Sequence, residues 1–229
     1  MKYYCIINCQ YPQITDKIKS YGYTIIPVEK SDDVSLQVSM HADMLYLKYY
    51  DTTIYVSHCQ QNNIDKLTKA GLVVNTVKLY PGYETECKLN MVITDKFILC
   101  NPKTALPNDI FENKKNLIST KQGYTKCSTI VINEDLFITD DVSVYSALTD
   151  AGCRCLGVEK GSIALEGYNY GFIGGASAYI PEKNIVLFFG DITKHSDYLK
   201  IVEFCNEYDI KIDYIKDMPL TDIGGAIFI

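Results

Sequence analysis

Apolar and amphipathic segments alternate along the chain in one repeating order. Two apolar strands joined by a turn are followed by a stretch with apolar residues three or four apart, and then by a third apolar strand. In the clearest copy, residues 128–139 predict the hairpin, residues 141–152 a helix and residues 153–158 the closing strand. Residues 176–216 repeat this order. The pattern therefore predicts ββαβ units.

Two further copies precede these. Residues 44–79 contain a hairpin, a helix and a strand, and residues 90–123 form a copy with a weaker middle that contains Pro102 and Pro107. In each copy the strands carry the Val, Ile, Tyr and Phe residues that suit a pleated surface.

The two ends of the chain complete a fifth copy if they lie side by side. The strand at 224–229 would pair with the strand at 2–8, which is followed by a helix over 12–22 and a strand over 23–29. The first strands of the five units are predicted to start at Met44, Met91, Thr129, Ser177 and Ala226. Units of about 46 residues then use the whole chain.

We therefore predict one α/β domain over residues 1–229, a pseudo-symmetric β/α propeller of five ββαβ repeats closed into a ring, with both termini in one unit. Closure would remove exposed sheet edges. An ordinary α/β sandwich is the competing architecture, although an open doubly wound sheet alternates single strands, not hairpins, with helices.

Composition narrows the range of partners. The chain has 22 basic and 28 acidic residues and a net charge of −6, with Arg154 as its only arginine, which argues against binding to nucleic-acid backbones. No segment is apolar enough to cross a membrane, and the first residues do not resemble a signal peptide. We expect a cytoplasmic protein with no nucleic-acid or membrane partner. The sequence leaves the oligomeric state open.

Nine cysteines without a repeated spacing indicate reduced thiols and not a disulfide framework. Cys153 and Cys155 have one residue between them and fall in one predicted strand, in which successive side chains alternate faces. No second pair has the spacing of a zinc finger, and we expect neither a metal site nor a cofactor. Most of the thiols are expected to be small buried apolar groups.

In a ring of equivalent units, the five segments that lead into the first strands meet at one end of the central axis. These segments contain several reactive or polar side chains, namely those of His41, Asp43, Asn90, Cys127, Ser128 and Asp222. Two glycine pairs, Gly174 with Gly175 and Gly224 with Gly225, would let the backbone approach a ligand closely. A thiol, an imidazole and carboxylates together supply the nucleophile, the acid or base and the orienting anion of thiol catalysis.

Each of these residues also has a structural explanation. A histidine such as His41 is more often a hydrogen-bonded packing residue than a catalyst, and a buried cysteine such as Cys127 is commonly inert. Asp222 would close a turn beside Gly224. The functional interpretation depends on their coincidence at corresponding positions of different units.

Other polar residues follow the second strands of the units. His195 is a second candidate base, but its position at a helix start favours the surface, and His58 occupies the corresponding place in the first unit. Asp140 and Asp141 also follow a second strand, where Asp141 would cap the next helix.

Five ββαβ units about a pseudo-fivefold axis resemble the guanidino-group-modifying enzyme fold, the pentein superfamily of arginine and agmatine deiminases, dimethylarginine dimethylaminohydrolases and amidinotransferases. In particular, the stretches HADM, QGYTKCS and YGFIGGAS are similar to those of an uncharacterised bacterial family assigned to that fold. The resemblance covers essentially the whole chain.

The resemblance implies roles for particular positions. The HAD stretch at 41–43 matches the His-x-Asp motif of these enzymes, and Cys127 lies two units further on, at the equivalent of their catalytic cysteine. Asp222 lies one unit before the motif, beside paired glycines, as does their acidic residue. The order agrees if the chain is circularly permuted. Two departures are that the terminal GGAIFI lacks a cysteine and that Ser177 stands where the enzymes often have an aspartate.

The function implied by this resemblance is that of a cysteine-dependent hydrolase or transferase acting on a guanidine or amidine C–N bond. Cys127 would attack the central carbon, His41 would protonate the departing amine, and Asp43 and Asp222 would hold the small cationic substrate. Lys126, if turned inward, would favour the thiolate. The other expected substrate-binding residues are Asn90, Ser128, Gly174, Gly175, Gly224 and Gly225. The alternative is a non-catalytic module that binds a small ligand or a protein at the same place.

Overall fold

The computed structural model describes residues 3–106 and 116–229, and its strands form five separate sheets of three strands. In every sheet the first strand is antiparallel to the central strand and the third strand is parallel to it. A parallel neighbour requires a crossover, and in four units a described helix provides it. The predicted ββαβ order is therefore confirmed in these units.

The elements of the five units have the following bounds. Unit 1 contains β3 (Tyr46–Tyr49), β4 (Thr53–Ser57), α3 (Gln61–Lys69) and β5 (Val73–Val77). Unit 2 contains β6 (Val92–Ile93), β7 (Phe97–Cys100) and β8 (Asn116–Ser119). Unit 3 contains β9 (Thr129–Val131), β10 (Leu136–Thr139), α5 (Val142–Asp150) and β11 (Arg154–Gly157). Unit 4 contains β12 (Ser177–Ile180), η4 (Pro181–Lys183), β13 (Ile185–Phe188), η5 (Ile192–Lys194), α6 (Tyr198–Glu207) and β14 (Lys211–Tyr214).

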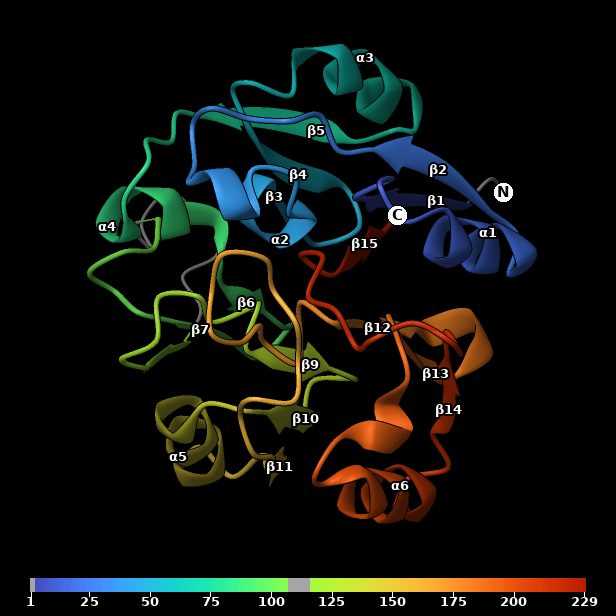
Figure 1. Ribbon diagram of the computed structural model, residues 1–229. Coiled ribbons are helices and arrows are strands. Elements are labelled where there is room, and N and C mark those ends of the chain that lie inside the picture. The colour runs from blue at the N-terminus through green and yellow to red at the C-terminus, as the bar shows by residue number, and fades with distance from the viewer. Residues whose placement is uncertain (1–2, 107–115) are drawn as a thin grey trace.

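Unit 5 joins the two ends of the chain (Figure 1). It contains β15 (Ala226–Phe228), β1 (Tyr3–Ile7), α1 (Pro12–Ser20) and β2 (Tyr23–Pro27). Strand β15 is antiparallel to β1 with Cys5 opposite Phe228, and backbone hydrogen bonds connect Tyr4 and Ile229 in both directions. The prediction that the termini share one unit is confirmed.

The middle of unit 2 is only partly described. Pro102 follows β7 in a turn, whereas Pro107 lies outside the described residues. The third strand, β8, runs parallel to β7, as predicted.

Short helical turns precede the first strands of units 1 and 2. These are η1 (Leu36–Val38), α2 (Ala42–Leu45), α4 (Tyr83–Glu86) and η2 (Cys87–Leu89). The predicted strand start at Met44 is therefore too early, whereas β6 begins at the residue after the predicted Met91. Met44 and Leu45 both donate to the carbonyl of His41, which closes a helical turn, and the whole of α2 is buried. A fully apolar run has no periodicity that separates a helix from a strand.

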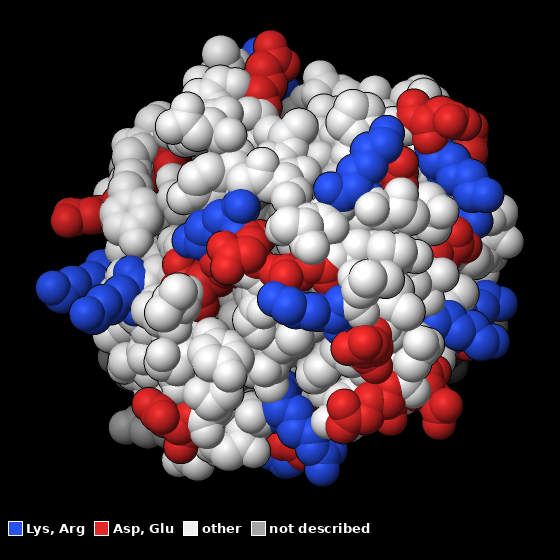
Figure 2. Space-filling view, turned by 60° about the horizontal axis from the view of Figure 1, so that its bottom comes forward, with Lys and Arg blue, Asp and Glu red and all other residues white. Residues whose placement is uncertain are grey.

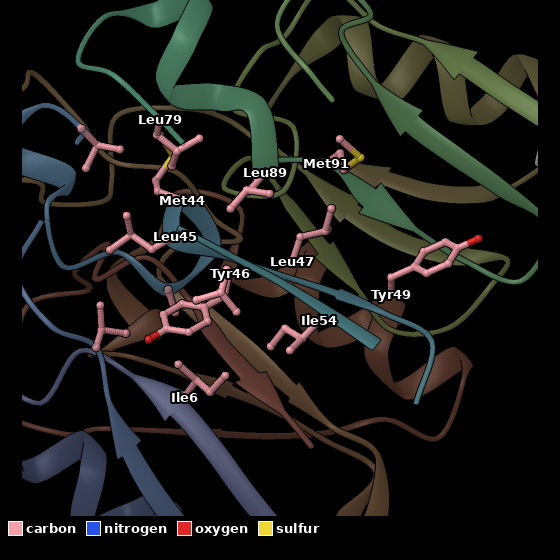
Figure 3. Close-up of a cluster of buried hydrophobic side chains, with 14 of the residues drawn as sticks. Ile6, Met44, Leu45, Tyr46, Leu47, Tyr49, Ile54, Leu79, Leu89 and Met91 are labelled. Atoms are coloured by element: carbon pink, nitrogen blue, oxygen red, sulfur yellow. The ribbon is translucent and has the colours of Figure 1, made fainter. Parts of the chain in front are cut away.

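Hydrophobic packing passes from each unit to its neighbour. The largest cluster packs β1 and β2 against β3, β4 and β7, and Figure 3 shows its side chains around Tyr46 and Leu47. A second cluster joins β7 to β10 and α5, a third joins β10 to β13 and α6, and a fourth joins β13 to β1 and α1. Complete burial of each aliphatic side chain contributes about 1.5–3 kcal/mol. The units are thus held by cores that lie between sheets.

The distribution of surface charge and the free state of the cysteines agree with the predictions from the sequence. On the face of the molecule that Figure 2 shows, Lys and Arg are interspersed with Asp and Glu and form no single continuous basic surface. No helix within residues 3–106 and 116–229 has the length and apolar character that a membrane crossing requires. All nine cysteines are free thiols, as predicted, and five of them are buried.

Candidate functional site

The segments that lead into the five first strands are joined by hydrogen bonds. The Asp43 amide donates to the carbonyl of Gly224, and the amide of the adjoining Gly225 donates to the carbonyl of Gly175. The Gly175 amide donates to the carbonyl of Cys127. The side chain of Asn90 then accepts from the Cys127 amide and donates to the Asp43 carbonyl. These bonds pass through all five units and return to the first.

Three reactive side chains meet inside this set of segments. A nitrogen of His41, a carboxylate oxygen of Asp43 and the Cys127 sulfur all lie within 4.8 Å of one another. Nδ1 of His41 is 3.7 Å from Oδ1 of Asp222 and 4.0 Å from Oδ1 of Asp43. All four residues are buried, with 2–3% of their surface exposed. The sequence-predicted nucleophile, base and two carboxylates therefore lie together.

The turn geometry of α2 brings His41 and Asp43 to the same place. His41 is the N-cap residue of α2 in an extended conformation, and Asp43 lies in the first turn. Within the described residues, Nδ1 of His41 has no hydrogen-bond partner, and the Asp43 carboxylate has none besides its contact with the Cys127 thiol. Such buried unpartnered groups cost free energy unless a ligand, ion or water satisfies them. This cost makes the place a candidate binding site.

Asn90 supports Cys127 directly. Its Nδ2 lies 3.0 Å from the Cys127 sulfur and 3.0 Å from the Asp43 carbonyl, and its Oδ1 accepts from the backbone amides of Lys126 and Cys127 at 2.8 and 3.2 Å. These contacts occupy both ends of the amide. Contact of Asn90 with a substrate stays a prediction.

Asp222 closes a turn and also faces the site. Its Oδ1 accepts from the Gly224 amide at 3.0 Å, which confirms the predicted turn, and its Oδ2 accepts from the Phe172 amide at 2.9 Å. Burial raises the pKa of Asp222 to about 6, an effect that the nearby His41 opposes. Asp222 therefore combines a structural contact with proximity to His41.

Glycine is required at the paired positions because neighbouring protein atoms occupy the space that a Cβ would take. A Cβ at Gly175 would overlap the Asp222 carboxylate, and one at Gly224 would overlap His41. A Cβ at Gly174 would lie 2.5 Å from the carbonyl oxygens of Lys126 and Thr129. The glycines thus permit close approach between the segments of the site. Their approach to a ligand stays a prediction.

Ser128 and Lys126 are engaged within their own turn. The Ser128 hydroxyl donates to the carbonyl of Thr125 at 3.1 Å. The ammonium of Lys126 lies 3.4 Å from the carbonyl of Thr129, and burial lowers the pKa of Lys126. Substrate contact by Ser128 stays a prediction.

The electrostatic environment of Cys127 opposes ionisation. Burial raises the pKa of its thiol well above the usual range, and the negative charges of Asp43 and Asp222 raise it further. Activated cysteines usually have a lowered pKa, because the thiolate is the nucleophile. The expected thiolate-favouring effect of Lys126 is thus outweighed in the unliganded protein, and a cation beside the carboxylates would change this balance.

A cavity of about 420 Å³ reaches the site from the hairpin end of the first strands. Residues of all five first strands line it, including Leu47, Ile93, Val131, Tyr179 and Ile227. Asp43, Lys126 and Gly225 also line the cavity, and they belong to the segments that precede these strands. Asp43 therefore borders both the cavity and the Cys127 thiol.

His195 is buried, contrary to the predicted surface position. Only 4% of its surface is exposed, and its Nδ1 accepts from the Asp197 amide at 3.1 Å. Burial lowers the pKa of His195. The local His-Ser-Asp pattern does indicate the start of α6, but it cannot reveal what packs over that start. His58 is exposed, as expected.

Asp140 and Asp141 have different roles. Oδ1 of Asp141 accepts from the amides of Ser143 and Val144, so the predicted helix cap is confirmed. Asp140 is buried, and its Oδ2 accepts from the Ile173 amide at 2.8 Å. Burial raises the pKa of Asp140 to about 8. The sequence signal for this support was only its position directly after a strand.

His41, Asp43 and Cys127 are also suitable ligands for a metal ion. Their imidazole, carboxylate and thiolate donors are the types that bind zinc, and their atoms lie close together. An ion held there would use the same sulfur and imidazole that thiol catalysis requires. Metal binding and a free nucleophile at Cys127 are therefore mutually exclusive.

The fold is similar to those of known enzymes at low sequence identity. The DDAH of Pseudomonas aeruginosa, a cysteine-to-serine mutant in complex with citrulline, matches with a TM-score of 0.59 and 8% identity over 100% of both chains. The agmatine deiminase of C. jejuni matches with a TM-score of 0.56 and 8% identity over 93% of this chain and 87% of that chain. Its cysteine-to-serine mutant with substrate bound gives 0.55 and 10% over the same shares. These likenesses support the pentein-like fold and concern the fold alone.

Comparison with curated protein sequences gave no match. A protein family, by contrast, matches residues 6–227, which is nearly the whole chain. The chain belongs to the family of unknown function DUF6873.

Proposed function

We propose that the protein is a cysteine-dependent hydrolase or transferase that acts on the C–N bond of a guanidine or amidine. The observation that carries the proposal is the approach of the Cys127 sulfur, a His41 nitrogen and an Asp43 oxygen to within 4.8 Å of one another. Similarity of the fold to agmatine deiminase and DDAH supports the choice of substrate class.

The charges around Cys127 favour a cationic substrate. Asp43 and Asp222 are buried beside the thiol, and a planar guanidinium or amidinium is complementary to two carboxylates. A bound cation would offset the charges that raise the thiol pKa. Ionisation of Cys127 is then coupled to the arrival of the substrate, and the unliganded thiol stays protected from other electrophiles.

The reaction begins when the Cys127 thiol gives its proton to His41. The thiolate forms a C–S bond with the central carbon of the substrate, the C–N bond breaks, and His41 passes the proton to the departing amine. The product of this step is an amidino-thioether. Asp222 orients the imidazole from a distance of 3.7 Å.

The second step releases the thioether. Water attacks the same carbon, the C–S bond breaks, and of the two protons that water loses, one returns to Cys127 through His41 and the other passes to solvent. A guanidine gives a urea and an amidine gives an amide. Attack by a second amine in place of water gives group transfer.

We also propose that the five units form one closed, propeller-like domain whose order is a circular permutation of the order in the enzymes. The hydrogen bonds that pass through all five leading segments support closure, as do the hydrophobic clusters between neighbouring units. The pairing of β15 with β1 supports the permutation, because it puts both ends of the chain in one unit.

The alternative is a binding module of the same fold, in which Cys127 only packs. The Asp43 carboxylate and Nδ1 of His41 would then bind a cation without a reaction. Covalent labelling tests whether a bound amidinium activates this one thiol, and turnover that depends on Cys127 separates the two functions.

The test uses the full chain with 2-chloroacetamidine and, separately, neutral iodoacetamide, with a chelator present throughout. We expect one amidine adduct, located at Cys127 by mass spectrometry, and a rate for the cationic reagent that exceeds that of labelling at the other cysteines by at least about tenfold. Cys127→Ser should abolish the adduct. Cys87→Ser is the matched control, because Cys87 is another buried thiol with a raised pKa.

Turnover is then screened with guanidines and amidines by release of ammonia or amine. Cys127→Ala should reduce turnover to the uncatalysed rate. Undiminished turnover in this variant, or amidine labelling spread over several cysteines, would overturn the proposal and favour the binding module.

A further inference from the structure

We infer that the cavity at the hairpin end binds an apolar substituent of the substrate, so that the enzyme acts on guanidines or amidines with an apolar body and no carboxylate. The inference rests on the proposed function. It adds the direction from which the substrate enters and the chemistry of its non-reacting part.

The position of the cavity relative to Asp43 supports this direction. Asp43 lines the cavity, its carboxylate has no hydrogen-bond partner besides the Cys127 thiol among the described residues, and only 3% of its surface is exposed. The Cys127 sulfur lies within 4.8 Å of this carboxylate. A cationic head bound by Asp43 therefore meets the thiol while the rest of the molecule extends into the cavity.

Backbone packs closely around Asp222, which does not line the cavity. The loop between β11 and β12 crosses near the centre of the view in Figure 1. Phe172 in this loop donates its amide to Asp222, the amide of Asp222 donates to Ala164, and Gly175 donates to the carbonyl of Cys127. These contacts hold backbone close to Asp222, and a Cβ at Gly171 would overlap its side chain.

The walls of the cavity suit an apolar group. Each of the five first strands contributes an apolar or aromatic side chain, and Leu47 and Met91 of this lining are labelled in Figure 3. A pocket that is mainly apolar with a few polar groups is typical of small-molecule sites. Its volume of about 420 Å³ accommodates a substituent of several carbon atoms.

The charges along the cavity disfavour a substrate carboxylate. The acidic lining residues are Asp43, Asp51, Asp95 and Glu134, whereas the basic ones are Lys48 and Lys126. Asp51 is paired with Lys48 at 2.9 Å and Glu134 with Lys96 at 3.9 Å, and burial lowers the pKa of Lys126. No arginine lines the cavity within residues 3–106 and 116–229 to provide a bidentate partner for a carboxylate. A free amino acid is therefore a poor fit.

The test compares the labelling rates of Cys127 with three reagents: 2-chloroacetamidine, its N-butyl derivative and its N-(3-carboxypropyl) derivative. Burial of the butyl chain should increase the second-order rate about tenfold or more over the parent reagent. The carboxypropyl derivative should react more slowly than the parent. Equal rates for the butyl and carboxypropyl derivatives would overturn the inference.

Variants that fill the cavity test whether the preference for the butyl derivative arises there. Val131→Phe, at a partly exposed wall position on β9, should reduce the ratio of the butyl rate to the parent rate to near one. Ile93→Phe on β6 repeats the measurement from another wall if the first variant fails to fold. Val142→Phe, on the exposed face of α5, is the matched control and should keep the ratio. An unchanged ratio in both cavity variants would overturn the inference.

The two proposals fail differently. Absence of amidine labelling at Cys127 with all three reagents contradicts the proposed thiol chemistry. Labelling of Cys127 without a preference for the butyl derivative preserves that chemistry and rejects only the apolar subsite.

Discussion

Asp140 and Asp222 each use one carboxylate oxygen to hold the segment that leads into β12. They accept hydrogen bonds from consecutive backbone amides, those of Ile173 and Phe172, at 2.8 and 2.9 Å. Burial raises the pKa of both groups, to about 8 and about 6 respectively. Each buried carboxyl loses favourable solvation, and its hydrogen bond holds the backbone of the segment beside Cys127.

Asp140 should make the folded protein less stable as pH rises. Its carboxyl keeps a proton up to about pH 8 in the folded state, whereas its ordinary pKa is 3.8. Between these values the folded state binds the additional proton, so the free energy of unfolding falls with pH by up to about 1.4 kcal/mol per unit. Asp140→Asn keeps an acceptor for Ile173 and should remove this slope, as measured by urea unfolding between pH 5 and 8.

The control for this measurement is Asp150→Asn, which removes an exposed carboxylate at the end of α5. A slope that persists unchanged in Asp140→Asn would show that other groups cause the pH dependence.

At the scale of elements, glycines determine how closely the leading segments approach. Gly175 has the Asp222 carboxylate in the space that a side chain would occupy, while its amide donates to Cys127. A bulkier residue must displace Asp222, Cys127 or both. The site is therefore sensitive to backbone packing as well as to its reactive side chains.

Gly175→Ala should reduce amidine labelling of Cys127 at least about tenfold and destabilise the fold by about 1–3 kcal/mol, because overpacking moves Asp222. The comparison is Gly152→Ala after α5, where φ is +82° but a Cβ has open space. That change should cost about 1–2 kcal/mol of backbone strain and leave the labelling rate unchanged. Labelling rates and urea unfolding are measured for both. Equal labelling in both variants would refute the positional role of Gly175.

At the scale of the whole molecule, the two ends of the chain pair with each other in one sheet. Strand β15 supplies one neighbour of β1, and β12 and α2 contact β15 in turn. The contacts of unit 5 with units 4 and 1 therefore involve the last residues of the chain, and unit 5 cannot form from either end alone.

A circular permutant should fold. Joining residue 229 to residue 3 through a short glycine-rich linker, with new ends between Ala70 and Gly71, preserves the pairing of β15 with β1. The new ends fall after α3, where the backbone turns at the surface. We expect cooperative thermal unfolding and the same Cys127 labelling as in the original chain. A variant that lacks residues 226–229 should lose both, because β1 becomes an open edge. Stability equal to that of the full chain in the truncated variant would contradict this interdependence.

The regular parts of the units were predictable because their signals are local. The hairpin of β9 and β10 and the helices α5 and α6 follow from strand residues, turn residues and helical periodicity within short windows. The start of β3 was not predictable. Met44 and Leu45 are buried in a helical turn, and burial from all sides removes the polar face that would have identified it.

For the site, the repeat in the sequence predicted which segments meet, but it did not predict their side-chain contacts. His41, Asp43, Cys127 and Asp222 were selected by equivalent positions in the repeat, and they do meet. The support of Cys127 by Asn90 and the burial of His195 depend on neighbours from other units. No local pattern contains such neighbours.

The sequence by itself determined the order of strands and helices, because periodicity and turn chemistry act between residues close in the chain. The five-unit count and the sharing of one unit by both ends followed from the repeat of that order along the chain. The tertiary structure alone decided the burial that raises the pKa of Cys127, the helical turn at α2 and the cavity that borders Asp43. These properties depend on burial and on charges contributed by distant segments. They are fixed only when the units pack against one another.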